Sequence, residues 1–438
     1  MPEKASAASR VLIDRATSWL MAQALTDADL ETVVRGCCER LLAAGIPLAR
    51  VHLSFSVLHP LYGALGFTWR RSEGLKVEGY RHTADGKTND RFKVSPYYHL
   101  RKHKLDHLRR RLDTDAPAEF PIFDDLKKEG LTDYLAFITA FDATKQQGMM
   151  GSWSTDSRDG FSDDEIEALI RVQDRLAVAA KMAVRGDVAK SALMTYLGPN
   201  AGQRVLSGQI KRGDGETIRA AIVWGDLRNS TAMAEQLGRQ TYIDNLNAFF
   251  DNVSGSVADA GGEILGFVGD GFLAIFPCER NQKESTEACQ LALAGAQEAV
   301  NRMEAANRGR ITGGELPLGF GIGLHIGNVM FGNVGLPDRL SFSVFGSAVN
   351  EATRLEQLTK KFSSPVIASA AFRDYCGGDW EPLGNEILRG SDSPMDVYRP
   401  AEKDGQMRGF SIVRRDRTRL LSDAEAVVVL HRDGATAP

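Results

Sequence analysis

The chain has few cysteines, and their spacing fits neither a disulfide framework nor a zinc site. Only five occur among 438 residues, two of them adjacent at Cys37 and Cys38. Long apolar runs are also missing, since no stretch approaches the roughly eighteen residues that a membrane span requires. The first residues, Met1-Pro2-Glu3-Lys4, lack the pattern of a signal peptide. These absences predict a reduced, soluble protein in the cytoplasm, with no membrane partner.

The chain also has no large excess of positive or negative charge. The formal net charge is −4 at pH 7, which gives no sign of a polyanionic partner and argues against nucleic acid as the main ligand. Hydrophobic residues make up 43% of the chain, enough for globular packing, and 438 residues exceed the usual size of a single core. The composition therefore predicts two globular domains.

Two aspartates stand at the ends of short apolar runs. Asp226 closes the run from Ala220, and Asp270 lies between two apolar stretches in Gly269-Asp270-Gly271. Glycines that take positive φ make the second segment a hairpin turn. Carboxylates at the edge of a sheet suit a pair of Mg²⁺ ions, which prefer hard oxygen ligands and retain substrate phosphates. A single strand-end aspartate is more often a turn former, so the downstream sequence has to decide.

A helical pattern follows about eighty residues later. Ala348, Ala352, Leu355 and Phe362 form one apolar stripe. Asn350 and Arg354 are four residues apart and share another face of the same helix, which on its own indicates only a solvated polar stripe.

Together with the two aspartates, this helix resembles the catalytic domain of the class III nucleotidyl cyclases, the adenylate and guanylate cyclases. That family carries an Asp after its first core strand, a Gly-Asp hairpin and a V-N-x-A-x-R helix, which is Val349 to Arg354 here. The resemblance covers roughly residues 205–400 in matching order. It implies an α+β fold, a ferredoxin-like βαββαβ core, and conversion of ATP to 3′,5′-cyclic AMP and pyrophosphate for signal transduction.

The resemblance also assigns roles to residues. Asp226 and Asp270, with the backbone of Leu227, would hold two Mg²⁺ ions, or Mn²⁺ in their place. Asn350 would orient the ribose, and Arg354 would stabilise charge on the α-phosphate. The backbone at the start of the next helix would hold the β- and γ-phosphates, through Leu227, Arg228, Asn229, Ser230 and Thr231.

Two further expectations follow from the family. Leu388-Arg389-Gly390 resembles its Leu-Lys-Gly motif, so Arg389 would bind the terminal phosphates. In this family the metal aspartates and the Asn/Arg helix of one site come from different subunits. The resemblance therefore implies a homodimer with two equivalent, shared sites.

The base-reading positions depart from the family pattern. The Lys or Glu that usually precedes the hairpin Asp by four residues is Gly266, and its partner position is Ser343. A glycine cannot hydrogen-bond a base edge, and a serine hydroxyl offers little discrimination. Adenylate cyclase is the first expectation because it is the commonest activity among bacterial relatives. A cyclase acting on GTP or a pyrimidine triphosphate, or a non-catalytic nucleotide-sensing module, stays open.

The rest of the catalytic region shows clear periodicity. An amphipathic helix over Ile243–Val257 ends at Gly261-Gly262, and a second helix covers Cys289–Met303. Strands are expected over Gly319–Gly327 and Val329–Gly335. The element order predicts an antiparallel-containing sheet with its helices on one face.

Residues 1–185 are expected to form a separate sensor or regulatory unit. Patterning predicts helices over Leu12–Leu25 and Leu30–Leu42 and a strand over Val51–Leu58. The arrangement is similar to GAF-like domains of bacterial cyclases, although no ligand follows from it. The quoted segments are Ser95-Pro96-Tyr97-Tyr98, Leu131-Thr132-Asp133-Tyr134-Leu135, Trp153-Ser154-Thr155-Asp156 and Gly160-Phe161-Ser162-Asp163.

A long helical pattern from Asp163 to Met194 joins the halves, either as an ordinary connector or as a helix that packs on its symmetry mate. Residues 186–204 would be a linker or transducing element, and the tail, residues 401–438, is expected to be partly disordered.

His99, His103 and His107 would share one face of a helix. Because they stand among many basic residues, a solvated helix is favoured over a metal site.

Overall fold

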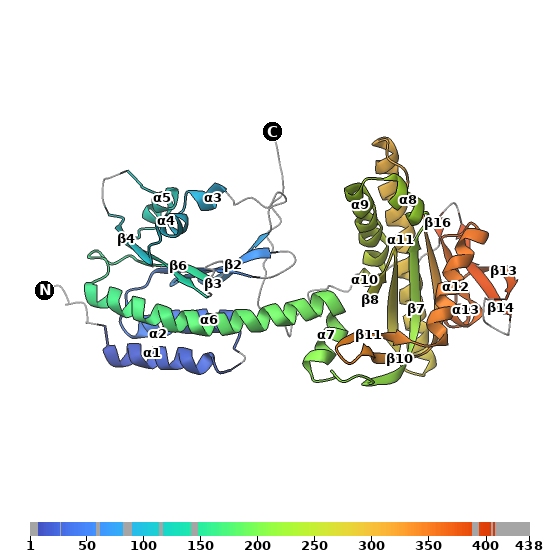
Figure 1. Cartoon of the computed structure of the whole chain (residues 1–438), viewed down its shortest axis with the longest axis horizontal. Helices are drawn as coiled ribbons and strands as arrows, with labels where there is room; N and C mark the ends of the chain where they lie inside the picture. The colour runs from blue at the N-terminus through green and yellow to red at the C-terminus, as the bar shows by residue number, and fades with distance from the viewer. Residues whose placement is uncertain are drawn as a thin grey trace. The chain divides into compact units, whose positions relative to one another are not determined.

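The computed structural model describes residues 8–26, 28–57, 62–81, 90–113, 117–141, 148–387, 394–403 and 406–407. Two compact units divide the chain between Ala192 and Leu193, within the helix α6 (Asp163–Leu197) (Figure 1). The long helix predicted from Asp163 is therefore confirmed. No helix within the described ranges combines the length and the apolar character that a membrane crossing requires.

The first unit is built on a six-stranded antiparallel sheet with the order β3-β2-β1-β6-β5-β4. Its strands are β1 (Arg50–Ser56), β2 (Tyr62–Arg70), β3 (Gly74–Arg81), β4 (His107–Arg111), β5 (Asp133–Ala140) and β6 (Gly148–Thr155). The helices are α1 (Arg10–Gln23), α2 (Leu30–Ala43), α3 (Asp90–Lys93), α4 (Pro96–His103) and α5 (Pro121–Lys128). Alternate residues of β1 pack with α1, α2 and α6, whereas α4 and α5 contribute to a second core cluster with β4 and β5.

The predicted row of three histidines is wrong. Helix α4 ends at His103, because Lys104 adopts the left-handed conformation with φ 55° and closes the helix. His107 begins strand β4 instead. The rings of His99 and His103 lie 4.4 Å apart, and the third imidazole belongs to another element.

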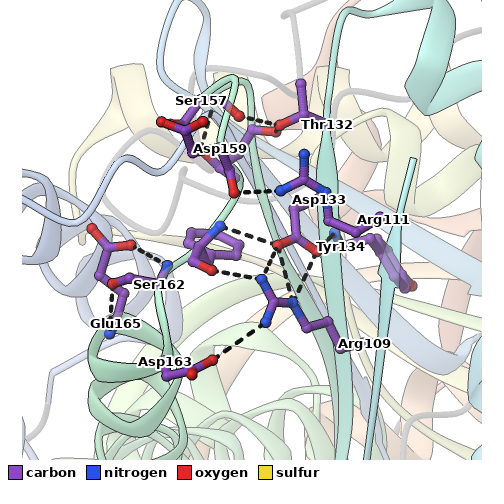
Figure 2. Close-up of polar contacts among 12 residues, drawn as sticks. Arg109, Arg111, Thr132, Asp133, Tyr134, Ser157, Asp159, Ser162, Asp163 and Glu165 are labelled. Carbon is purple, nitrogen blue, oxygen red and sulfur yellow. Dashed lines mark hydrogen bonds and ion pairs between the residues drawn. The ribbon is translucent and has the colours of Figure 1, made fainter. Parts of the chain in front are cut away.

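The start of α6 is anchored to the sheet through a buried carboxylate (Figure 2). Asp133 is fully buried and accepts the backbone N–H of Phe161 at 3.0 Å and the guanidinium of Arg109 at 2.8 Å. Ser162 and Glu165 then form a reciprocal capping box at the helix N-terminus. The segments around Asp133 and Phe161 were noted in the sequence without an assigned role. In the structure they fix where α6 begins.

The second unit contains an eight-stranded mixed sheet with the order β13-β14-β12-β10-β7-β9-β8, and β11 pairs with β10 off this path. Its strands are β7 (Gly215–Leu227), β8 (Glu263–Val268), β9 (Gly271–Cys278), β10 (Phe320–Leu336), β11 (Arg339–Phe345), β12 (Val366–Ser369), β13 (Trp380–Glu386) and β14 (Met395–Pro400). A separate two-stranded ribbon joins β15 (Glu402–Lys403) and β16 (Gln406–Met407). The two strands expected between 319 and 335 are one continuous strand, β10.

The helices of this unit are α7 (Pro199–Leu206), α8 (Ser230–Gln236), α9 (Arg239–Phe249), α10 (Gly255–Asp259), α11 (Gln282–Thr312), α12 (Ser347–Lys361) and α13 (Ala370–Cys376). A π-helical turn, Phe250–Ser254, connects α9 to α10. The helix predicted over Ile243–Val257 therefore exists, with a π turn inside it, and it ends before Gly261, whose φ is +96°.

The expectation of helices on one face of the sheet is wrong. Helices α9, α10, α11 and α13 share a core cluster on one face, while α7 and α12 pack on the other. The physical reason lies in β10, where Gly321, Gly323 and Gly327 point toward α12. At these glycines no side chain separates the strand from the helix, so the backbone of the helix can approach the sheet directly.

Candidate active site

The structure brings the two predicted metal residues together at one end of the central strands. Asp226 lies in β7 opposite Gly271 of β9 and Gly321 of β10. Asp270 occupies the turn between β8 and β9, where Gly269 has the positive φ of +62° that the hairpin requires. The backbone N–H of Leu227 donates to the carbonyl of Asp270 at 3.2 Å. This bond fixes the two acidic positions relative to each other.

The two carboxylates are suited to a cation. Burial, and then the negative charge of Asp270, raises the pKa of Asp226 above its usual value. A Cβ at Gly271 would stand 2.9 Å from Oδ1 of Asp226, so the glycine keeps that oxygen uncovered. Carboxylate oxygens are the hard donors that Mg²⁺ prefers, and a bound cation would relieve the repulsion between these two charges.

Further ligands for such an ion would have to come from outside the acidic pair. Within the described ranges, no group of three or more His, Cys, Asp and Glu side chains is arranged to hold a metal. Mg²⁺ commonly binds through one or two carboxylates together with substrate phosphates and water. The donor set therefore fits a site that is completed by its substrate.

The turn after β7 has an unusual backbone. Asn229 is left-handed, with φ 60° and ψ 21°, and helix α8 begins at Ser230. The Ser230 hydroxyl donates to Oδ2 of Asp270, which joins the turn to the acidic pair. The guanidinium of Arg228 donates to the carbonyl of Thr359 at 3.0 Å, so this side chain ties the turn to the end of α12. The predicted phosphate-binding segment, including Leu227 and Thr231, is thus a tight turn beside the two aspartates.

A third carboxylate, which the sequence did not reveal, lies behind Asp226. Glu356 of α12 is 3% exposed, and Oε1 stands 2.5 Å from where a Cβ at Gly321 would be. Burial, and then the charge of Asp226, raises the pKa of Glu356 to about 7. Glu356 could have been singled out from the sequence, because it lies four residues after Ala352 and so places an acid on the apolar stripe of the helix.

Asn350 and Arg354 do not join the aspartates within the same chain. Ala348 and Ala352 are the α12 residues that touch the glycines of β10. At 100° per residue, Asn350 and Arg354 lie about 160° around the helix from Ala352, on the side away from the sheet. Asn350 is exposed, Arg354 is half-buried, and neither side chain has a hydrogen bond among the described residues. Their polar groups are available to something beyond this sheet.

Helix α12 is held in register by a buried histidine. The His325 ring lies 2.8 Å from the hydroxyl of Ser369 through Nδ1 and 2.9 Å from Oε2 of Glu351 through Nε2. The Nε2–H donates to the carboxylate, because a carboxylate can only accept. That bond lowers the pKa of Glu351 below its usual value. Since Glu351 adjoins Asn350, the contact fixes the rotation of the helix that presents Asn350 and Arg354.

The predicted base-reading positions lie on β8 and β11, which are not hydrogen-bonded to each other. Gly266 sits beside an irregularity in the β8 pairing, and nothing stands within 4 Å of a Cβ placed there. Ser343 is in β11, opposite Gly332 of β10. Strands β8 and β11 contribute to one core cluster through Leu265 and Phe342. Arg389, expected at the terminal phosphates, lies outside the described residues, as does most of the tail.

Comparison with known proteins shows what the second unit is similar to. Residues 215–370 match the family model described as the adenylate and guanylate cyclase catalytic domain. The chain is 30% identical to Adenylate cyclase 1 of Rhizobium meliloti over 176 residues, which is 40% of this chain and 26% of that protein. It is also 30% identical to the adenylate cyclase of Anabaena cylindrica over 159 residues, covering 36% and 31%. The chain thus spans less than a third of either relative.

Among solved structures, the guanylyl cyclase Cya2 shares 26% identity over 42% of this chain and 92% of that chain, with a TM-score of 0.37. The adenylyl cyclase CyaB from P. aeruginosa shares 21% identity over 44% and 99%, with a TM-score of 0.38.

Proposed function

Because residues 215–370 belong to the adenylate and guanylate cyclase catalytic domain family, we propose that this chain converts ATP to 3′,5′-cyclic AMP and pyrophosphate. The observation that carries the proposal is the acidic pair. Asp226 and Asp270 meet at the end of the central strands, and the pKa of Asp226 is raised by burial and by its neighbour. The relatives named as adenylate cyclases support ATP as the first substrate to test.

Asp226, Asp270 and the carbonyl of Leu227 would hold two Mg²⁺ ions, or Mn²⁺. When bound, these ions would lower the pKa of the ribose 3′-hydroxyl and neutralise charge on the phosphates. The N–H groups of Leu227 and Arg228 are bonded to the carbonyls of Asp270 and Gly319, so within the turn over residues 227–231 those of residues 229–231 would bind the β- and γ-phosphates. Asn350 would orient the ribose, Arg354 would face the charge on the α-phosphate, and Arg389 would bind the terminal phosphates.

Two copies of the chain would share each active site. The support is the geometry of α12, which turns Asn350 and Arg354 away from the sheet that carries Asp226. Residues that face away from their own sheet would be free to complete a site on another chain. In a two-fold dimer, each copy would supply the metal ligands of one site and the Asn/Arg pair of the other.

A second candidate is a cyclase with relaxed base preference, acting on GTP or a pyrimidine triphosphate as well. Gly266 favours it, because the open space at that position holds no side chain to bond a base. A non-catalytic nucleotide sensor is less well supported, since Asp226, Asp270, Asn350 and Arg354 are all present.

The remaining parts are proposed to regulate the catalytic domain, which would cover residues 205–400. Residues 1–185 would act as a GAF-like sensor and residues 186–204 as the transducing element. The support is α6, whose start is fixed by Asp133 in the first unit and whose last residues belong to the second. The GAF-like assignment and a cytoplasmic location stay predictions, because the matched family model begins at residue 215.

The test is a survey of ATP, GTP, CTP and UTP with Mg²⁺ or Mn²⁺, with the product identified by mass. Cyclic AMP formed from ATP, and lost in Asp270→Ala, supports the proposal. Cyclic GMP as the sole product would instead favour a guanylate cyclase. Nucleotide binding without any cyclic product, in protein shown to be dimeric, favours the sensor.

A further inference from the structure

Five residues form a straight row across the sheet of the first unit, on the face that carries α4 and α5. Cross-strand pairing places them directly opposite one another, in the order Arg110, Tyr134, Ser154, Arg50 and Arg70. Two of the three arginines have carboxylate partners. Arg70 forms a two-point contact with Glu129 at 3.0 and 3.2 Å, and Arg110 forms one with Glu119 at 2.6 and 3.3 Å. Arg50, between them, has no ion pair among the described residues.

The unpartnered arginine has an unpartnered neighbour. Nε of Arg50 is buried without a hydrogen bond, and so is Oγ of Ser154, which stands opposite it on β6. Ser154 is fully buried, while Arg50 is only half-buried and so remains accessible from one side. A buried donor that lacks an acceptor costs free energy, and two adjacent ones require an explanation.

The groups beside this pair on β1, α4 and β6 are neutral. His52 bonds to the hydroxyl of Tyr97 at 2.8 Å, and Tyr97 donates to the hydroxyl of Ser152 at 3.1 Å. Burial, and then the charge of Arg50, lowers the pKa of His52 to about 3, so the imidazole is uncharged near neutral pH. The guanidinium of Arg50 thus lies beside hydroxyls and a neutral ring, and in the described part of the chain the nearby acid, Glu129, is paired with Arg70.

We propose that Arg50 and Ser154 form the binding site for a carboxylate group of a small molecule. One uncompensated guanidinium matches one negative charge, and its planar fork suits the two oxygens of a carboxylate. The Ser154 hydroxyl supplies a further donor at the floor of the site. This inference concerns the first unit only, and it holds whether or not the second unit cyclises ATP.

The test uses the full chain and measures binding by calorimetry and by the shift in unfolding temperature. The probes are acetate, succinate and benzoate, their neutral amides as matched controls, and inorganic phosphate. At least one carboxylate should bind saturably and raise the unfolding temperature, whereas its amide should not. Arg50→Gln should weaken that binding about tenfold or more. Arg110→Gln, which removes an arginine of the same row that already has a partner, should leave it unchanged.

Ser154→Ala keeps the test decisive if Arg50→Gln does not fold. Its hydroxyl has no partner, so the variant should fold at least as stably as the wild type without ligand and bind the carboxylate more weakly. The proposal is overturned if no carboxylate binds better than its amide. It is equally overturned if only phosphate binds, or if the Arg50 and Ser154 variants that fold bind as well as the wild type.

Discussion

The carbonyl oxygen of Ala352 lies 2.1 Å from the position that a Cβ on Gly323 would occupy. Helix α12 therefore rests on β10 with its backbone, and the strand can carry only glycine at this point. Because the obstacle is backbone and not the end of a flexible side chain, it cannot rotate away. The placement of Asn350 and Arg354 thus depends on a residue that carries no functional group.

Gly323→Ala should accordingly destabilise the second unit by about 1–3 kcal/mol, the usual cost of overpacking. It should also lower turnover, because α12 must shift. Gly266→Ala is the matched control, since no atom lies within 4 Å of the added Cβ, and its free energy of unfolding should change by about 0.5 kcal/mol or less. Denaturant unfolding of both variants measures the difference. Equal stabilities would contradict the close packing of α12.

Asp226→Asn should abolish turnover and yet stabilise the metal-free protein at neutral pH. Its folded pKa is raised, so the charged form is penalised in the fold, and stability falls as pH rises from the unfolded pKa through the folded one. The amide removes that penalty and also a metal ligand, which should cost about 10³-fold or more in turnover. Unfolding curves in EDTA measure the stabilisation, and turnover in Mg²⁺ measures the loss of activity. Asp338→Asn, an exposed turn substitution, is the control.

Much of this site follows from local sequence because its parts are local structures. The hairpin around Asp270 was predictable from glycines that permit positive φ, and α12 from its 3.6-residue period. The position of α12 relative to the sheet was not predicted, because it depends on long-range packing. The contact between α12 and β10 is encoded by the alternate spacing of three glycines, Gly321, Gly323 and Gly327. From the sequence alone these could not be told apart from ordinary strand glycines. Glu356 was missed for the same reason, since its neighbour Asp226 is distant in the chain.

Shared sites predict a specific pattern of complementation. Asp226→Ala mixed with Asn350→Ala should recover about a quarter of wild-type turnover, because half the dimers are mixed and each of those has one intact site of two. Asp226→Ala mixed with Asp270→Ala should recover none, since both residues belong to the same half of a site. Heterodimers should be confirmed by differential tags. Inactivity of the first mixture despite such heterodimers would contradict shared sites.

The contact between His325 and Glu351 predicts a loss of stability in acid. The bond from His325 holds the folded pKa of Glu351 below its ordinary value of 4.5, so its contribution is complete above that value and is lost as pH falls through the lower folded pKa. Glu351→Gln should therefore be less stable than the wild type at about pH 6.5, with the difference shrinking below about pH 4. Unfolding curves across this range provide the measurement. A difference that is constant with pH would show that the charge of Glu351 plays no part.

Base choice should be weak in the wild type and improvable by one substitution. Gly266 stands where a long polar side chain would bond the base, and Ser343 offers only a hydroxyl, so ATP and GTP should differ by about 1–3 kcal/mol, the scale of one lost polar contact. Gly266→Lys has room, because nothing lies within 4 Å of its Cβ and its φ is not in the left-handed region. The variant should favour ATP more strongly, as shown by kcat/KM for both triphosphates. Gly266→Met is the control for size without charge. A wild type that already selects ATP by several thousandfold would show that another residue reads the base.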